Sequence, residues 1–199
     1  MRLFLASLSL AALPEFLGAK VRRVAWVPAA ADVLEDGARV RALFGAMLDE
    51  LGLSPLVCEL DDGDGATLAA RLAATDAVIV TGGDPFHLLA RCRASGLDRA
   101  LASAVRDGLP YVGVSAGAIV AGPSLEPCFL TSPFTPPRGL ALEGLALTDR
   151  VVLPHHDRDD NRHLHALAAD RFGARFALEP IDDDEALIVE AGVARRVRA

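Results

Sequence analysis

The sequence predicts an α/β fold: a three-layer sandwich in which helices cover both faces of a mainly parallel central sheet. Short apolar runs alternate along the chain with segments whose apolar residues recur at helical spacing. The short runs are apolar at nearly every position, as expected for strands buried on both faces. Such alternation is typical of parallel strands joined by crossover helices. Because 199 residues suffice for one well-buried core, we expect a single domain over residues 1–199.

The first part of the chain alternates regularly between strands and helices. Strands are expected where β-branched and other apolar residues cluster, at 2–7, 24–28, 55–60 and 76–81. Helices are expected where apolar residues recur three or four positions apart, at 40–51, 67–74, 86–93 and 97–107. Gly52 ends the first of these helices and Gly96 separates the last two, while the acidic segment 61–65 is predicted to be a turn.

The N-terminal apolar run, residues 3–13, has two interpretations. It has the length of the apolar core of a secretory leader, but a single arginine precedes it and Pro14-Glu15-Phe16 is a poor cleavage context. We therefore interpret it as a buried strand that leads into a helix.

The second part of the chain begins with a strand at 110–114 and then becomes less regular. Five prolines fall within 123–139, which predicts a long loop. A further strand is expected at 151–153, followed by a helix at 161–171. Closing strands are expected at 176–178, 186–190 and 193–198, with a hairpin turn at Glu190-Ala191-Gly192.

Composition and charge exclude several classes of function. The formal net charge of −7 and the aromatic content of 5% argue against nucleic-acid binding, which needs a basic face and stacking side chains. No segment has the uninterrupted apolar length that a membrane span requires, so no membrane partner is expected. Cys58, Cys92 and Cys128 are odd in number and widely spaced, which predicts free buried thiols in a reducing, cytoplasmic compartment.

The segment Tyr111–Ala118 is the most informative about function. Ser115 stands between Gly113 and Gly117 in a G-x-S-x-G pattern, after a predicted strand and before an apolar, helix-like run. This is the pattern of a nucleophile elbow, a tight turn that projects a serine hydroxyl from the end of a strand. The alternative is a glycine-rich strand–helix turn with an incidental serine.

A serine nucleophile needs a base, and the base needs an acid that orients it. His155 and His156 follow the predicted strand 151–153 and Pro154, so they are expected on the same rim of the sheet as Ser115. In an extended chain these two side chains point opposite ways, so only one faces the serine. The residues alone leave the acid open among Asp157, Asp182, Asp183, Asp184 and Glu126.

The histidine- and aspartate-rich segment 155–165 raises a metal site as an alternative. It contains no H-x-x-x-H pair, and its carboxylates lack the spacing of a calcium-binding loop. We therefore expect no metal ion and no other cofactor, and we interpret the remaining charges as solvated or helix-capping.

Four stretches, in this order, resemble the peptidase E (aspartyl dipeptidase) family of serine peptidases, whose wider relatives include cyanophycinase. They are Val80–Leu89, Gly113–Ala118, Leu153-Pro154-His155 and 181–187. The similarity spans nearly the whole chain. It implies a flavodoxin-like sheet of the kind found in class I glutamine amidotransferase domains.

The resemblance implies a role for each matching residue. Ser115 would be the nucleophile and His155 the general base, and the position of the acid, often glutamate in the family, falls on Asp183. The backbone N–H groups of Gly83 and Ala116 would form the oxyanion hole.

Family members also place an arginine after the catalytic histidine to bind an acidic substrate side chain. Arg162 is the better match to that arginine and Arg158 the weaker one.

Two departures from the family concern the substrate pocket. The usual Gly-Gly-Gly-Asn turn reads Thr81-Gly82-Gly83-Asp84 here, and the chain ends sooner after its last strand than the well-known dipeptidases do.

From the motifs and the resemblance, we expect a serine peptidase-like hydrolase that acts on small peptides, with Asp-X dipeptides as the substrates that the resemblance implies. A homodimer is compatible with this expectation. The alternatives are a non-catalytic or regulatory binding domain that retains the elbow, and an esterase or amidase.

Overall fold

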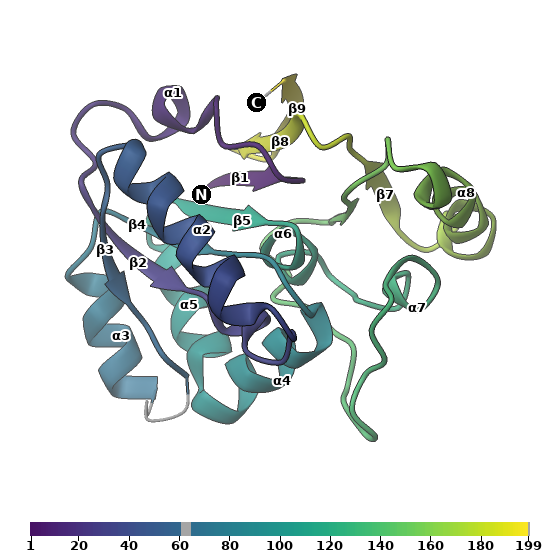
Figure 1. The fold of residues 1–199 in the computed structure, drawn as a ribbon, viewed down its shortest axis with the longest axis horizontal. Helices are drawn as coiled ribbons and strands as arrows, with labels where there is room; N and C mark the ends of the chain where they lie inside the picture. The colour runs from purple at the N-terminus through teal and green to yellow at the C-terminus, as the bar shows by residue number, and fades with distance from the viewer. Residues whose placement is uncertain (61–64, 199) are drawn as a thin grey trace.

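The computed structural model describes residues 1–60 and 65–198. A seven-stranded sheet in the order β3-β2-β4-β5-β1-β8-β9 forms its centre (Figure 1). The parallel strands are β1 (Arg2–Ala6), β2 (Arg23–Val27), β3 (Ser54–Val57), β4 (Ala77–Val80) and β5 (Tyr111–Val114). Antiparallel strands β8 (Glu185–Glu190) and β9 (Val193–Arg198) extend the β1 edge. The predicted α/β sandwich with a mainly parallel sheet is confirmed.

Alternation of side chains along each strand builds two cores, one on each face of the sheet. In β1, Leu3 and Leu5 point into one core, whereas Phe4 and Ala6 point into the other. The first core is covered by α3 (Gly65–Ala73), α4 (Pro85–Ser95), α5 (Leu97–Arg106) and α6 (Ala116–Val120). The second is covered by α1 (Leu13–Leu17) and α2 (Gly37–Glu50). Helices thus lie on both sides of the sheet.

A second, smaller sheet lies beside the central one. Strand β6 (Arg150–Leu153) pairs in parallel with β7 (Ala177–Pro180), apart from the central sheet (Figure 1). Helix α8 (Asp159–Phe172) packs on this pair through a small core of its own. The apolar pattern of β6 is the same in either sheet, so the sequence does not reveal which partner it takes.

Other boundaries differ by a few residues. Strand β3 ends at Val57 rather than at residue 60, and the predicted turn at 61–65 falls mostly on residues outside those described. A short 3-10 helix, η1 (Ala29–Ala31), follows β2, and helix α7 (Cys128–Thr131) interrupts the predicted proline-rich loop. In the part of the chain that the structure describes, no helix combines the length and apolar character needed to cross a bilayer.

The glycines of the elbow are required by close backbone packing. A Cβ on Gly113 would stand 2.5 Å from the carbonyl oxygen of Gly117, and a Cβ on Gly117 would stand 2.0 Å from that of Val80. Helix α6 therefore begins directly against strands β4 and β5, which places Ser115 at their carboxyl ends.

Gly117→Ala is expected to lower the free energy of unfolding by about 1–3 kcal/mol, because the added methyl group overpacks against the Val80 carbonyl. Gly45→Ala is the matched control, since it lies within α2 and its new Cβ would meet nothing closer than Trp26 at 3.7 Å. Helix propensity predicts that this control is neutral or slightly stabilising. Chemical denaturation measures both variants, and equal stability of Gly117→Ala and the parent protein would contradict the packing described.

Candidate active site

Ser115 occupies a strained position between β5 and α6. Its backbone has φ 51° and ψ −109°, in a region that non-glycine residues rarely adopt. The fold compensates with backbone hydrogen bonds: the N–H of Ser115 donates to the carbonyl of Ala6 at 2.9 Å, and its own carbonyl accepts from Ala118 and Ile119. Such strain costs on the order of 1–3 kcal/mol and persists only where the surroundings enforce it. This geometry is that of the elbow predicted from the G-x-S-x-G pattern.

The structure brings His155 to Ser115. His155 Nε2 lies 2.9 Å from Ser115 Oγ. The histidine also has a left-handed backbone, with φ 65°, and both of its backbone polar groups are bound. Its N–H donates to Ser7 Oγ at 2.7 Å, and its carbonyl accepts from Asn161 Nδ2 at 2.8 Å. These contacts fix the orientation of the ring.

Among the candidate acids, Asp183 is the one in contact with the ring. Its Oδ1 lies 2.5 Å from His155 Nδ1, and its Oδ2 accepts from Arg158 Nε at 2.9 Å. Asp157 contacts the backbone of Asp183 instead: its Oδ1 accepts a hydrogen bond from the Asp183 N–H at 3.0 Å.

Two of the other three acids pair with arginines. Glu126 forms an ion pair with Arg175 at 2.7 Å, and Asp184 lies 3.4 Å from a guanidinium nitrogen of Arg198. Asp182 directly precedes Asp183 in the chain, and the backbone N–H of Asp182 donates to the Glu185 carboxylate.

The electrostatic environment favours a neutral imidazole beside an ionised carboxylate. Burial, and secondarily the positive charge of Arg158, lower the pKa of His155 below its ordinary value, against the opposing effect of Asp183. Burial opposes ionisation of Asp183 most strongly, but hydrogen bonds from His155, Arg158 and Ser7 outweigh it and lower the pKa of that carboxyl. With Nδ1 facing a carboxylate, the hydrogen-bond network assigns the ring proton to Nδ1 and leaves Nε2 to accept from Ser115.

The glycine turn after β4 passes beside the serine. A Cβ on Gly82 would lie 3.2 Å from the Cβ of Ser115, and Gly83, with φ 143°, approaches the carbonyl of Ala30 so closely that a Cβ would lie 2.0 Å from it. Within residues 1–60 and 65–198, neither the Gly83 nor the Ala116 N–H has an acceptor in the fold. Both amides belong to the segments that meet at the serine hydroxyl.

The two residues that depart from the family's usual turn have structural partners. Thr81 is buried, and its Oγ1 accepts from Trp26 Nε1 at 3.1 Å. Asp84 caps α4 by accepting from the backbone N–H groups of Phe86 and His87. Neither residue lines the cavity beside Ser115. This departure from the family therefore changes the contacts that support the turn and does not change the residues that line the cavity.

Of the two candidate arginines, only Arg158 reaches the cavity beside Ser115. Arg158 lines this cavity and binds Asp183, with its side chain half-exposed. Arg162 lies exposed on α8, about one turn further on, and is not among the lining residues. The helix begins at Asp159, so Arg158 immediately precedes it and Arg162 lies within it.

Ser7 is a site residue that the sequence reasoning missed. It is fully buried just after β1, its Oγ donates to Asp183 Oδ1 at 3.0 Å, and it accepts from the His155 N–H. The available signal was a serine directly after an apolar parallel strand, at the carboxyl end where working residues gather.

The second histidine, His156, does not line the cavity beside Ser115 and pairs with His165 of α8. Their rings stack with centroids 5.2 Å apart, and the two Nδ1 atoms lie 3.0 Å from each other. Burial, aided by the neighbouring histidines, lowers the pKa of His165 to about 4. This stacked pair links the segment after β6 to α8. Among the described residues, no cluster of three or more histidine, cysteine or acidic side chains could hold a metal ion.

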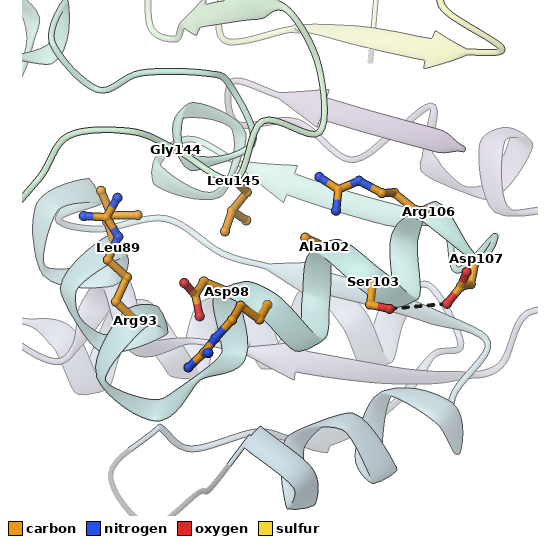
Figure 2. Close-up of a pocket in the computed structure, with 10 residues that line it drawn as sticks. Leu89, Arg93, Asp98, Ala102, Ser103, Arg106, Asp107, Gly144 and Leu145 are labelled. Atoms are coloured by element: carbon orange, nitrogen blue, oxygen red, sulfur yellow. Dashed lines mark hydrogen bonds between the residues drawn. The ribbon is translucent and has the colours of Figure 1, made fainter.

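A separate cavity of about 410 Å³ lies between α4, α5 and the Gly144–Leu145 segment (Figure 2). Arginines and aspartates line it, but Arg93 is bound to the carbonyls of Ala141 and Glu143. None of the residues predicted for catalysis lines this cavity.

Comparison with known proteins gives the family. The model of peptidase family S51 matches residues 6–197. This chain belongs to peptidase family S51. Its match to a peptidase E of Streptomyces coelicolor is 39% identical over 145 residues, 72% of this chain and 55% of that protein, so the chain spans about half of the length of this relative.

Other relatives of this S51 chain match over more of their length. An uncharacterized peptidase of Listeria innocua is 30% identical over 173 residues, 84% of this chain and 80% of that protein. A crystal structure of a putative peptidase E protein from Listeria monocytogenes superposes with a TM-score of 0.86 at 24% identity, over 100% of this chain and 98% of the other. The structural likeness supports the same fold.

Arg158→Ala is expected to raise the pKa of His155, because the guanidinium is a positive charge that disfavours the imidazolium. Histidine ring signals followed by NMR during a pH titration measure the effect, with His155 assigned by comparison with His155→Gln. Arg162→Ala is the control and should leave the titration of His155 unchanged. A His155 titration that does not move in Arg158→Ala would contradict the electrostatics described.

Ser7→Ala is expected to lower the free energy of unfolding by about 1–3 kcal/mol, because it removes the acceptor of the His155 N–H and a donor to Asp183. Ser9→Ala provides the comparison, since Ser9 Oγ accepts an exposed hydrogen bond from the backbone N–H of Ala11, and the loss of this bond should cost about 0.5 kcal/mol or less. Urea denaturation of the two variants distinguishes them. Identical decreases in the free energy of unfolding would contradict the structural role described for the Ser7 hydroxyl.

Proposed function

We propose that this S51 protein is a serine peptidase that hydrolyses small peptides. The observation that carries the proposal is the continuous chain of contacts from Ser115 Oγ to His155 Nε2, at 2.9 Å, and from His155 Nδ1 to Asp183 Oδ1, at 2.5 Å. A nucleophile, a base and an orienting acid within hydrogen-bond reach are the parts that acyl transfer needs. The adjoining cavity, of about 350 Å³, has the size of a small-ligand site.

In the proposed reaction, Ser115 Oγ attacks the carbonyl carbon of a peptide bond while His155 Nε2 takes the hydroxyl proton. Asp183 keeps the proton of Nδ1 in place and stabilises the imidazolium that forms. The tetrahedral intermediate then collapses as His155 gives its proton to the leaving amine, which leaves an acyl group on Ser115. A water molecule, deprotonated by His155, hydrolyses the acyl-enzyme and restores the serine.

The backbone N–H groups of Gly83 and Ala116 are proposed to bind the oxyanion. Their hydrogens are free of acceptors within the described fold, and both segments adjoin the serine. Ala116 is also the first residue of α6, where unpaired N–H groups favour negative charge. The loss of one such donor typically costs about 3–4 kcal/mol of transition-state stabilisation.

Ser115→Ala is expected to lower kcat/KM for the best dipeptide by about 10⁴-fold or more, because it removes the nucleophile while leaving the fold intact. Ser103→Ala, on α5 and outside the site, serves as control and should retain activity. A panel of dipeptides and simple esters measures the rates, and mass spectrometry locates the site of a fluorophosphonate label.

The outcomes separate the proposal from its alternatives. Turnover of esters without turnover of peptides would indicate an esterase with the same machinery. A protein that hydrolyses nothing and takes no label on Ser115 would be a binding domain that retains the elbow. Either result would contradict the peptidase proposal.

A further inference from the structure

The cavity beside Ser115 has a largely apolar wall built from distant parts of the chain. The segment after β1, the segment after η1, helices α2 and α6, and the segment after α7 all contribute. The large apolar side chains that line the cavity are Leu8, Leu34, Val40, Phe44, Ile119 and Phe134. Because five segments bring apolar side chains to one place beside the serine, the character of the wall is a property of the fold rather than of a single loop.

This wall is also where the two cores of the molecule reach the surface. Phe134 packs against the core that Ile119 shares with helices α3–α6, and Val40 packs against the core that Phe44 shares with α1. Phe44 and Ile119 are only 5% and 6% exposed, because each packs into one of the two cores. An apolar substrate side chain that entered the cavity would extend these cores and lose its contact with water.

The charged groups of the cavity do not favour an acidic side chain. Apart from His155, the only ionisable side chain among its described lining residues is that of Arg158. Arg158 Nε already donates to Asp183 at 2.9 Å, so a substrate carboxylate would have to share this guanidinium with the acid. It would also lose hydration against an apolar wall, which is costly for a charged group.

We infer that the cavity receives an apolar side chain of the substrate, of the size of leucine, methionine or phenylalanine, from a residue next to the scissile bond. The inference rests on the proposed peptidase function and gives that function its substrate class. It departs from the acidic side chain that the family resemblance implies.

Binding of matched dipeptides to the Ser115→Ala variant tests the inference without depending on turnover. Isothermal titration calorimetry compares Leu-Ala with Asp-Ala, and Ala-Leu with Ala-Asp. In at least one pair, the leucine peptide is expected to bind ten to a hundred times more tightly, the range typical of discrimination by an apolar pocket. Equal or tighter binding of the aspartyl peptides in both pairs, or no binding of any of the four, would overturn it.

Two neighbouring substitutions in the Ser115→Ala background test whether the wall sets the preference. Leu34→Arg places a cation within the lining, and it is expected to reduce the leucine-to-aspartate affinity ratio at least tenfold. Val33→Arg adds the same charge at the next residue, which is 53% exposed and does not line the cavity, and it should change that ratio less than twofold. Equal effects of the two substitutions would overturn the inference.

Failure of the proposed function would appear in a different measurement. The unmodified protein would then hydrolyse none of the four dipeptides and would take no fluorophosphonate label on Ser115, whatever the order of the affinities. If instead aspartyl dipeptides were hydrolysed faster than leucyl dipeptides, the result would support the proposed peptidase function and would contradict the inferred preference for an apolar side chain.

Discussion

The contact between Ser115 Oγ and His155 Nε2, at 2.9 Å, is the interaction on which the rest of the site depends. It joins the central sheet, through β5, to the separate small sheet, through β6. Both residues have a left-handed backbone, so each is held against its local preference. The compensating acceptors are adjacent in the chain: the carbonyl of Ala6 for the Ser115 N–H and the hydroxyl of Ser7 for the His155 N–H. The end of β1 therefore sets the position of both groups.

The same strand also places Asp183. Asp183 precedes β8, which pairs with β1 along its whole length, and Ser7 Oγ donates directly to the carboxylate. Burial lowers the pKa of His155, and hydrogen bonds, Arg158's included, lower that of Asp183. At neutral pH this leaves a neutral imidazole beside an ionised carboxylate, which is the state that the proposed mechanism requires.

The sequence was sufficient for the main sheet and for the elbow, because hydrophobic periodicity and the spacing of glycines are local signals. It was insufficient for contacts that depend on how distant segments meet. Several carboxylates precede β8 in one run, and only the family resemblance, not the run itself, singles out Asp183 as the one that meets the ring. The same holds for the contacts of Ser7, for the pairing of β6 with β7, and for which of Arg158 and Arg162 lines the cavity.

A crystal structure of the protein after reaction with a fluorophosphonate tests the central claim most directly, since the adduct mimics the tetrahedral intermediate. The account predicts phosphorus bonded to Ser115 Oγ, with the phosphoryl oxygen about 2.7–3.1 Å from the backbone nitrogens of both Gly83 and Ala116. An adduct on another residue, or a phosphoryl oxygen directed away from both nitrogens, would contradict it.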